Sequence, residues 1–468
     1  MNPLRLRDLA ADVDGDLVDV PDPEATVCGA VADSRQVSEG DLYVAIAGER
    51  VDGHDFAAGA VAAGAAAVLA ARPVGVPAVV VPDPVAALGR LAAATLARLR
   101  VRGGPRVVAV TGSSGKTTTK DLLASVLGAA GPVVAPVGSF NTEVGVPLTI
   151  LRSDDSTATL VLEMGARGVG HIAYLTRIAP PDIAVVLNVG SAHLATFGDR
   201  ATIAAAKGEL VESVAPEGLA VLNADDPLVA AMRDRTPGRV RTFGESAAAD
   251  VRADSVRLDE LGRPSFRLVS DGQAEPVSLP LHGAHQVSNA LAAATVALEC
   301  GLPLPAVAAG LSAVVPASRW RMEVSRTAAG VTVINDAYNA NPDSMRAALK
   351  ALVAMSAGHR SWAVLGEMRE LGQDATAEHD AIGRLAVRLD VSRLVAVGAG
   401  ARPIHLGASH EGSWGQESQY VEDPDAAIAV LLAELRPGDV VLVKASRAVG
   451  LERVAEALLA GAATGERP

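Results

Sequence analysis

One segment constrains the fold of this chain more than any other, the stretch VVAVTGSSGKTTTK at residues 107–120. An apolar run leads through Gly112 and Gly115 into a sequence with helical character. A strand, a tight turn and the start of a helix direct several backbone N–H groups and the positive helix end toward one anion. The usual phosphate-binding loop is G-x-x-x-x-G-K-[ST], and Val110 stands where its first glycine would be. The segment therefore predicts an abbreviated phosphate-binding loop at the end of a strand.

The rest of the chain repeats the same rhythm of strand and helix. Near-continuous apolar strands separated by amphipathic helices are typical of a parallel sheet that is covered on both faces. The 468 residues predict three α/β domains. These are an N-terminal α/β domain at 1–103, a central phosphate-loop (P-loop) domain with a parallel sheet at 104–315, and a doubly wound, Rossmann-like domain at 316–468.

Finer features are expected inside these domains. The apolar stretch 59–81 is interrupted by Arg72 and Pro73, and it predicts a buried helix followed by a strand rather than a membrane span. The polar alternation at 251–270 predicts a small antiparallel insertion in the central domain. In the last domain, we expect helices to begin near Pro342, Thr376, Pro424 and Leu451.

Composition limits the partners and the compartment. The formal net charge is −13, and without a compensating basic tract this argues against nucleic acid and anionic membranes as partners. Cys28 and Cys300 are too far apart in sequence for a disulfide framework or a metal knuckle, which fits a reducing compartment. The first residues, MNPLRLRDLAADVDGD, lack the apolar run of a signal peptide. We expect a cytoplasmic monomer without membrane insertion.

Polar residues after successive strands of the central domain suit phosphate and metal. Lys116 would place a positive charge near the outer phosphates, and the Thr117 hydroxyl is placed to hold Mg²⁺. Glu163 and His193 follow two further strands, and in such sheets the carboxyl ends of the strands face the ligand crevice. Taken alone, Glu163 equally suits a solvated strand end and His193 an ordinary loop histidine. Lys207, inside a predicted helix, is by itself better explained as a solvated surface lysine.

A series of segments in this order resembles the Mur ligase family, ATP-dependent amide-forming enzymes of peptidoglycan synthesis. The abbreviated TGSSGKTTTK loop is that family's version, and folylpolyglutamate synthetases share it. The other matching segments are DSRQVSEGDLYVAIAGERVDGHDF (33–56), FNTEVGVPLT (140–149), EMGARGVGHI, NVGSAHLATFG, AAAKGEL, HQVSNALAAA, INDAYNANPDSM, LGEMRELG and VLVKASR. Within the family, DAYNANPDSM and LGEMRELG indicate the member that adds D-alanyl-D-alanine.

Three positions depart from the family pattern. Thr142 stands where a second asparagine is frequent, Ser318 where a glycine often precedes the arginine, and Ala445 where K-G-S-R usually has glycine. These departures leave fine contacts open and do not affect the reaction class that the resemblance implies.

The resemblance also implies a set of site residues, each matched to a family motif. ATP would be bound by Gly112, Ser113, Ser114, Gly115, Lys116, Thr117, Thr118, Asn289, Arg319, Asp336, Tyr338 and Asn339. The UDP-N-acetylmuramoyl-tripeptide and the incoming D-alanyl-D-alanine would contact Ser34, Arg35, Asn141, Thr142, Asn341, Lys444, Ser446 and Arg447. Two Mg²⁺ ions would be held by Thr117, Glu163, His193 and Lys207, the last as an N-carbamate. Lys116, Lys207, His193 and Arg319 would be catalytic.

This set implies a ligation in two steps. ATP would phosphorylate the carboxylate of the UDP-linked tripeptide, and the amine of the dipeptide would then displace phosphate. The first domain would hold the UDP end, the second the phosphates and the third the dipeptide. The alternatives are the sibling ligase that adds diaminopimelate or lysine as the third residue, a folylpolyglutamate synthetase, a small-molecule kinase, and a non-catalytic ATP-binding regulator on the same fold.

Overall fold

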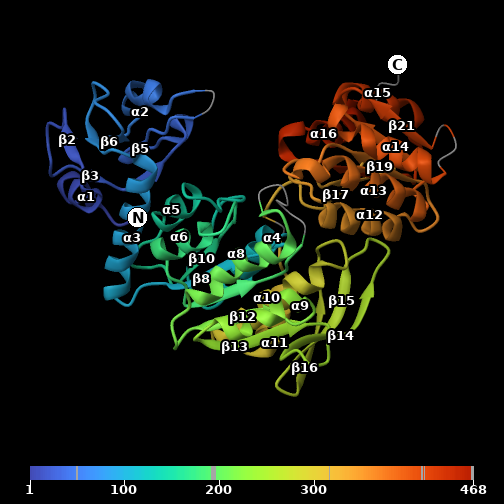
Figure 1. Cartoon of the computed structure of the whole chain (residues 1–468), viewed down its shortest axis with the longest axis horizontal. Coiled ribbons are helices and arrows are strands. Elements are labelled where there is room, and N and C mark those ends of the chain that lie inside the picture. The colour runs from blue at the N-terminus through green and yellow to red at the C-terminus, as the bar shows by residue number, and fades with distance from the viewer. Residues whose placement is uncertain (49–50, 191–196, 316, 413–414, 416, 465–468) are drawn as a thin grey trace.

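The structure, a computed structural model, describes residues 1–48, 51–190, 197–315, 317–412, 415 and 417–464. The described residues form three bodies in chain order, with the first and the third on either side of the central one (Figure 1). Each body is built on a sheet of mainly parallel strands with helices packed on it. The three-domain α/β architecture is therefore confirmed, whereas the boundaries set at residues 103 and 315 stay predictions.

The first body contains a five-stranded sheet in the order β2-β7-β6-β5-β4. Its strands are β2 (Asp16–Val18), β4 (Gly29–Val31), β5 (Asp41–Val44), β6 (Ala67–Ala70) and β7 (Ala78–Val80), parallel except for β2. A ribbon of β1 (Leu4–Arg5) and β3 (Thr26–Val27) accompanies helix α1 (Leu6–Val13).

The prediction for the stretch 59–81 was partly wrong. Helix α2 (Ala57–Ala62) is short, and the next apolar residues form the strand β6 instead of extending the helix. All of Ala67–Ala70 is buried in the sheet interior. Burial on both faces favours a strand here, because packing against neighbouring strands overrides the helical preference of alanine.

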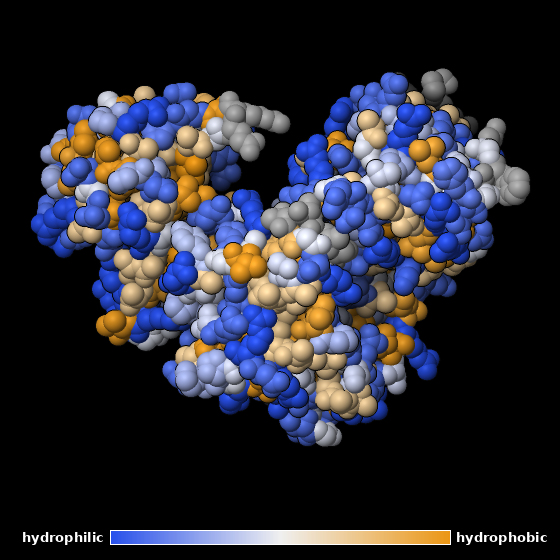
Figure 2. Space-filling view, viewed as in Figure 1, coloured by the Kyte–Doolittle hydropathy of each residue, from blue (hydrophilic) through white to orange (hydrophobic). Residues whose placement is uncertain are grey.

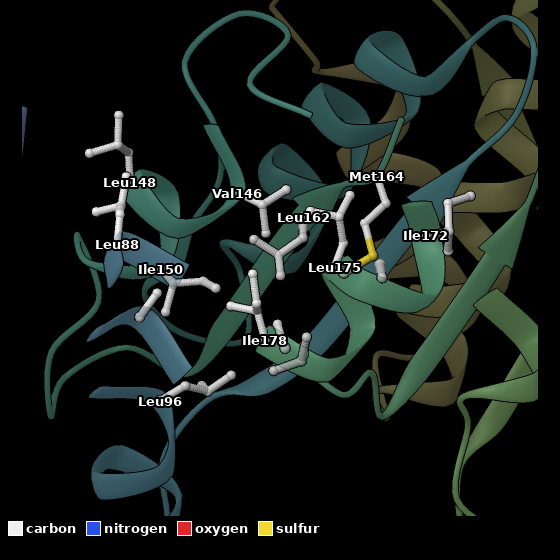
Figure 3. Packing of buried hydrophobic residues seen from close by; sticks show 14 of the residues in the cluster. Leu88, Leu96, Val146, Leu148, Ile150, Leu162, Met164, Ile172, Leu175 and Ile178 are labelled. Carbon is white, nitrogen blue, oxygen red and sulfur yellow. The ribbon is translucent and has the colours of Figure 1, made fainter. Parts of the chain in front are cut away.

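Helix α3 (Pro84–Val101) joins the first body to the central one. Asp83 caps its N-terminus by accepting hydrogen bonds from two backbone N–H groups, and Pro84 occupies the first turn, where a missing N–H costs little. Leu88 and Leu96 on this helix belong to one buried cluster with residues of α5 (Gly145–Ile150) and α6 (His171–Ile178) (Figure 3). The two bodies thus share a hydrophobic core.

The central body has a nine-stranded sheet in the order β16-β15-β14-β13-β12-β11-β8-β10-β9. The strands are β8 (Arg106–Thr111), β9 (Val133–Val134), β10 (Thr159–Glu163), β11 (Ile183–Val186), β12 (Leu219–Asn223), β13 (Arg239–Gly244), β14 (Val251–Leu258), β15 (Pro264–Ser270) and β16 (Gln273–Ser278). The predicted antiparallel segment is confirmed, but β14 pairs in parallel with β13, so the segment extends the main sheet.

Helices cover both faces of this sheet. One face carries α5, α6, α8 (Arg200–Glu212) and α9 (Pro227–Ala230). The other carries α4 (Lys116–Leu127), α10 (Gln286–Glu299) and α11 (Leu304–Ser312). Alternate residues of β8 enter the two separate cores, as expected for a parallel strand buried on both sides.

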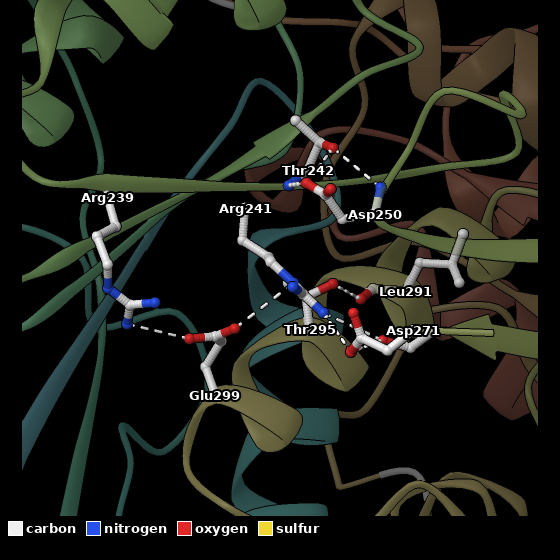
Figure 4. Close-up of polar contacts among 9 residues, drawn as sticks. Arg239, Arg241, Thr242, Asp250, Asp271, Leu291, Thr295 and Glu299 are labelled. Atoms are coloured by element: carbon white, nitrogen blue, oxygen red, sulfur yellow. Dashed lines mark hydrogen bonds and ion pairs between the residues drawn. The ribbon is translucent and has the colours of Figure 1, made fainter. Parts of the chain in front are cut away.

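Ion pairs join β13, an interior strand of this sheet, to α10 (Figure 4). Glu299 pairs with Arg239 at 3.1 Å and with Arg241 at 3.5 Å. Arg241 also pairs at 2.7 Å with Asp271, which lies in the turn between β15 and β16. None of these side chains lines the cavity described below, so their role is structural.

The third body has a six-stranded sheet in the order β17-β18-β22-β19-β20-β21, parallel except for β17. Its strands are β17 (Glu323–Arg326), β18 (Thr332–Asn335), β19 (Ser361–Leu365), β20 (Arg393–Val397), β21 (Ser418–Val421) and β22 (Val440–Lys444). Its helices are α12 (Pro342–Ser356), α13 (Ala375–Arg388), α14 (Arg402–Glu411), α15 (Pro424–Glu434) and α16 (Glu452–Thr464). The four predicted helix starts are confirmed to within one residue, and α14 was not predicted.

A hollow separates the first body from the third, over the central body (Figure 2). The central and third bodies touch. A Cβ atom on Gly190 would lie 2.2 Å from Asp343 Oδ2, and one on Gly262, in the turn between β14 and β15, would lie 3.0 Å from Met355 Cγ on α12. Within the described part of the chain, no helix is both long and apolar enough to cross a membrane.

Candidate active site

The phosphate loop has the predicted geometry of strand, turn and helix. Strand β8 ends at Thr111 and α4 begins at Lys116. Gly115 has φ +81°, and a Cβ atom there would come within 2.3 Å of Asn289 Oδ1. Only glycine fits this turn, because a side chain would be both strained and in collision. The first N–H groups of α4 and the positive end of its dipole are therefore available to an anion.

Neighbouring segments hold the loop in shape. Asn188, just beyond β11, accepts a hydrogen bond from Ser114 N–H at 3.0 Å and donates one to the Ser114 carbonyl at 3.2 Å. Ser113 Oγ accepts from the N–H of Gly190 at 2.9 Å. The loop is thus ordered by the protein itself, which lowers the cost of ordering it around a nucleotide.

Lys116 lies over this loop. Its ammonium donates to the Gly112 carbonyl at 2.7 Å. Burial lowers the pKa of Lys116, the Glu163 carboxylate opposes this shift, and the Arg321 guanidinium adds to it. A phosphate at the loop would offset both the burial and the neighbouring cation.

Oxygen atoms gather beside the loop at the end of β10. The Thr117 hydroxyl donates to Glu163 Oε2 at 2.8 Å. The other carboxylate oxygen of Glu163 accepts from Ser139 Oγ at 2.9 Å and from Asn141 Nδ2 at 2.8 Å. Glu163 is almost completely buried, so it is not the solvated strand end that the sequence alone allowed.

This arrangement fits a magnesium ion shared with a nucleotide. Mg²⁺ usually takes one or two carboxylates together with substrate phosphates and water, and Thr117 and Glu163 offer a hydroxyl and a carboxylate next to the phosphate loop. Among the described residues, no three His, Cys, Asp or Glu side chains lie together as a metal site of their own. His193, predicted as a ligand, lies outside the described residues.

Lys207 is not a solvated surface lysine. The residue lies on α8 and is only 3% exposed, and it forms no hydrogen bond or ion pair with another described residue. Burial lowers its pKa well below the ordinary value, and the Lys116 ammonium lowers it further. Packing of α8 against the sheet therefore buries an amine whose uncharged form is favoured.

The opposite wall of the site comes from the loops after β18 and β22. Lys444 is buried and donates to Asp336 Oδ2 at 2.5 Å and to the Asn339 carbonyl at 2.9 Å. Asn341 caps α12 through a reciprocal pair of hydrogen bonds with Ser344. These predicted binding residues thus also hold their own loops in place.

The segment between the central and third bodies carries two arginines in different environments. Arg319 is 71% exposed, lies 3.9 Å from Glu456, and does not line the cavity. Arg321 does line it, with its guanidinium over the ring of Tyr338 at 4.2 Å. The Arg321 Nε atom is buried and has no hydrogen-bond partner among the described residues. The cavity wall thus contains Arg321, whereas Arg319, which the resemblance placed at the phosphates, lies outside it.

These elements enclose a cavity of about 570 Å³ between the central and third bodies. The predicted residues that line it are Ser113, Ser114, Gly115, Lys116, Thr117, Thr118, Asn141, Thr142, Glu163, Asn289, Asp336, Tyr338, Asn339, Asn341, Lys444, Ser446 and Arg447. Gly112, Lys207 and Arg319 lie outside its wall, as do Ser34 and Arg35 of the first body. Arg35 is exposed and pairs with Asp33 at 2.7 Å.

Comparisons with known proteins agree along the whole chain. Three domain families match: Mur ligase family, catalytic domain, at residues 27–110; Mur ligase middle domain at 110–297; and Mur ligase, glutamate ligase domain, at 320–447. The UDP-N-acetylmuramoyl-tripeptide–D-alanyl-D-alanine ligase of Mycobacterium bovis is 54% identical, and the match covers 98% of each chain. The chain belongs to the Mur ligase family.

Solved Mur ligases share the fold as well as the sequence. MurF from Acinetobacter baumannii has a TM-score of 0.88 and 31% identity, covering 98% of this chain and 99% of that one. MurF ligase from Thermotoga maritima, solved in complex with ADP, has a TM-score of 0.79 and 32% identity, covering 94% and 98%. The corresponding ligase of Escherichia coli is 36% identical over 93% of this chain and 94% of its own.

Sequence reasoning missed several residues in the cavity wall of this Mur ligase. They include Ser139, Asn188, His285, Arg321 and Arg369. Asn188 could have been found, because it ends a strand whose carboxyl end faces the crevice. Arg321 carried only a weak signal, since it lies two residues after another arginine and nothing local distinguishes the two.

Proposed function

We propose that this Mur ligase uses ATP to join D-alanyl-D-alanine to UDP-N-acetylmuramoyl-tripeptide, giving the pentapeptide precursor, ADP and phosphate. One observation carries the proposal: the phosphate loop faces the loops after β18 and β22 across a single cavity. Relatives of that name that match over nearly the full length support it. A cytoplasmic location is part of the proposal, because ATP is a cytoplasmic substrate.

The first step would activate the acid. A carboxylate oxygen of the tripeptide attacks the γ-phosphorus of ATP, the bond to the bridging oxygen breaks, and ADP leaves. Negative charge on the equatorial oxygens would be balanced by Lys116 and Arg321, which both line the cavity. Thr117 and Glu163 would hold Mg²⁺, whose charge would further stabilise the phosphates. Asn289, beside Gly115, and Asp336, Tyr338 and Asn339 on the other wall would bind the rest of the nucleotide.

The second step would form the amide. The dipeptide amine attacks the acyl carbon, and the tetrahedral intermediate collapses with loss of phosphate and of an amine proton. Holding the amine beside the acyl phosphate can contribute up to about 7–11 kcal/mol. Water must be excluded, because it would hydrolyse the acyl phosphate. The close approach of Gly190 to Asp343 brings the two walls together at the cavity and supports the exclusion of water.

We also propose that Lys207 carries an N-carbamate. The uncharged Nζ attacks CO₂ and loses a proton, so a neutral amine becomes a carbamate anion. The buried side chain, its lack of a partner among described residues and its lowered pKa support this reaction. The carbamate would offset the Lys116 charge and offer oxygens to a second Mg²⁺. Protein equilibrated with ¹³C-bicarbonate should show a carbamate carbon signal that Lys207→Arg lacks.

The UDP end of the acid substrate is assigned to the first body, with Ser34 and Arg35 as its ligands. The hollow between the first and third bodies supports this assignment, because it leaves a long substrate room to reach the cavity. Arg35→Ala should raise the KM of the UDP-linked substrate and leave the KM of ATP unchanged.

One assay tests the function. Purified protein is mixed with ATP, Mg²⁺ and UDP-muramoyl-tripeptide, and with D-alanyl-D-alanine, diaminopimelate, lysine or no amine. Phosphate release and product mass are measured, and a parallel series uses UDP-muramoyl-dipeptide, the acid that the sibling ligase would need. We expect product only from the tripeptide with D-alanyl-D-alanine. Product from the dipeptide with diaminopimelate or lysine would identify the sibling, and full ADP formation without acid would contradict a ligase.

A further inference from the structure

A buried histidine supports the third-body wall of the cavity without lining it. His379, in the first part of α13, is 1% exposed. Its Nε2 atom accepts a hydrogen bond from Met368 N–H at 2.8 Å, and its Nδ1 atom lies 2.6 Å from the Ala375 carbonyl oxygen. A backbone N–H can only donate and a carbonyl can only accept. The imidazole is therefore neutral, with its proton on Nδ1.

Met368 belongs to a short loop, residues 366–371, that follows β19. Met368 and Leu371 are buried, whereas Arg369 and Glu370 between them are exposed and line the cavity. Glu370 has φ +64°, a left-handed conformation that costs about 1–2 kcal/mol for a residue other than glycine. The loop keeps this shape because contacts at its other residues hold it.

Two of those contacts act on successive backbone N–H groups. The N–H of Met368 is bound by His379, and the N–H of Arg369 donates to Ser446 Oγ at 2.9 Å. The Ser446 N–H in turn donates to the Glu367 carbonyl at 3.0 Å. The loop is thus fixed between α13 and the segment that follows β22, which itself lines the cavity.

Arg369 is the cation of this wall that is most available to a ligand. Lys444 is buried against Asp336, and Arg447 pairs with Glu452 at 2.5 Å. Arg369 is 55% exposed, and its pair with Glu367 is longer, at 3.4 Å. A ligand carboxylate could therefore pair with the Arg369 guanidinium without breaking a buried ion pair.

We propose that His379 is a positioning residue for the incoming dipeptide: the neutral imidazole fixes the loop 366–371 so that Arg369 faces the dipeptide carboxylate. This inference rests on the proposed function, since it needs a dipeptide as the acceptor. His379 would act on dipeptide affinity through the loop and would leave the phosphate loop of the central body untouched.

The arrangement predicts sensitivity to acid. Protonation at Nε2 would place an N–H against the Met368 N–H and break the contact. Burial lowers the pKa of His379, while the Ala375 carbonyl and the carboxylates of Glu367 and Glu378 oppose this shift. Glu378 is itself paired with Arg346 at 2.9 Å. The stabilisation is therefore complete above the unfolded-state pKa of about 6.5 and is lost as the pH falls from there toward the lower folded-state pKa.

Kinetics of two variants test the proposal. His379→Leu should raise the dipeptide KM by about tenfold and leave the ATP KM within about twofold. His379→Gln should recover most of the affinity, because its amide oxygen can accept from Met368 N–H. In the wild type, the dipeptide KM should rise toward acid pH, and in His379→Gln it should not. Equal changes in every KM, or an unchanged dipeptide KM, would overturn the proposal.

His54 provides a matched control in the first body. Its Nε2 accepts from Ala71 N–H at 2.9 Å and its Nδ1 lies 2.6 Å from Asp52 Oδ1, and it does not line the cavity. His54→Leu should lower the melting temperature without changing the dipeptide KM. If the dipeptide KM also rises in His54→Leu, the effect of His379→Leu would be explained by a general loss of stability.

Hydrogen exchange gives a measurement that needs no dipeptide. The Met368 amide should lose protection in His379→Leu at about pH 7.5, after correction for intrinsic exchange. In the wild type it should lose protection only as the pH falls below the ordinary histidine pKa of about 6.5, toward the lowered pKa of His379. Unchanged protection would refute the positioning role even if the variant's activity falls. If wild-type protein makes no pentapeptide while this protection behaves as expected, the proposed function fails and the loop contact stands.

Discussion

The two walls of the cavity handle positive charge in opposite ways. On the central wall, Lys116 donates only to a backbone carbonyl. Arg321, from the segment that joins the central and third bodies, acts on Lys116 as a second cation and has a buried nitrogen without a partner among the described residues. On the third-body wall, Lys444, Arg447 and Arg369 each pair with a carboxylate. A triphosphate brings several negative charges, which call for unmatched cations. A dipeptide is a zwitterion, which suits a wall whose charges are already balanced.

This difference has an energetic consequence. Burying cations without carboxylate partners is unfavourable, and the lowered pKa values of Lys116 and Lys207 reflect it. An anion at the central wall would relieve that penalty, so the wall gains most from ligand binding. The third-body wall gains less from its ligand and contributes more to the stability of the ligand-free fold.

The largest effect is expected from removing the central cation. Lys116→Ala should lower ATP turnover by about 10³-fold or more, because it removes a charge placed at the developing phosphoryl charge. Steady-state phosphate release in the presence of the acid substrate measures this. Lys350→Ala, an exposed lysine on α12, serves as the control and should behave as wild type. Wild-type activity in Lys116→Ala would show that the positive charge of the central wall has no role in the reaction.

Lys207→Ala should lower activity by about 10²-fold, because the site would lose the proposed carbamate oxygens. Added formate should restore part of the activity by supplying a small carboxylate in the space left by the side chain. Acetamide, which is similar in size and uncharged, should not. Full activity without formate would show that the buried amine has no part in ligation.

Arg321 and Arg319 allow an arginine in the cavity wall to be compared with a neighbouring arginine outside it. Arg321→Ala should lower kcat by about 10²-fold, because it removes a guanidinium that lines the cavity. Arg319→Ala should change kcat by no more than about twofold, since exposed ion pairs contribute about 0–1 kcal/mol. A larger loss of kcat in Arg319→Ala than in Arg321→Ala would assign the phosphate-binding role to Arg319, as the sequence predicted.

A smaller effect on rate than that of Lys116→Ala is expected at the third-body wall, where the cations are paired. Lys444→Met leaves the Asp336 carboxylate without its buried partner and should cost about 3 kcal/mol of stability in the third body. Calorimetric melting measures this, with the exposed pair of Arg453 and Asp425 as control. Arg453→Ala should cost no more than about 1 kcal/mol. If Lys444→Met lowered kcat strongly while the melting temperature stayed unchanged, the contrast between the two walls would be contradicted.

Local patterns predicted much of this molecule. The phosphate loop at 112–117, the strand β8 and the helix starts near Pro342 and Pro424 depend on neighbouring residues alone. The error at β6 has a different origin, because the alanine-rich sequence is locally helical and the surrounding sheet makes it a strand. The antiparallel extension β14–β16 was predicted as a segment, whereas its pairing with β13 depended on a distant contact.

The candidate site shows the same difference between what local sequence patterns predict and what long-range packing decides. The sequence alone predicted the phosphate loop around Lys116 and Thr117 and the strand-end position of Glu163, because glycine geometry and strand periodicity act over a few positions. Only the tertiary structure decided that Lys207 is buried, that Arg321 rather than Arg319 lines the cavity, and that His379 holds the loop at Met368. Burial, charge pairing and hydrogen bonds across the fold depend on elements that are distant in sequence, and packing alone brings these elements together.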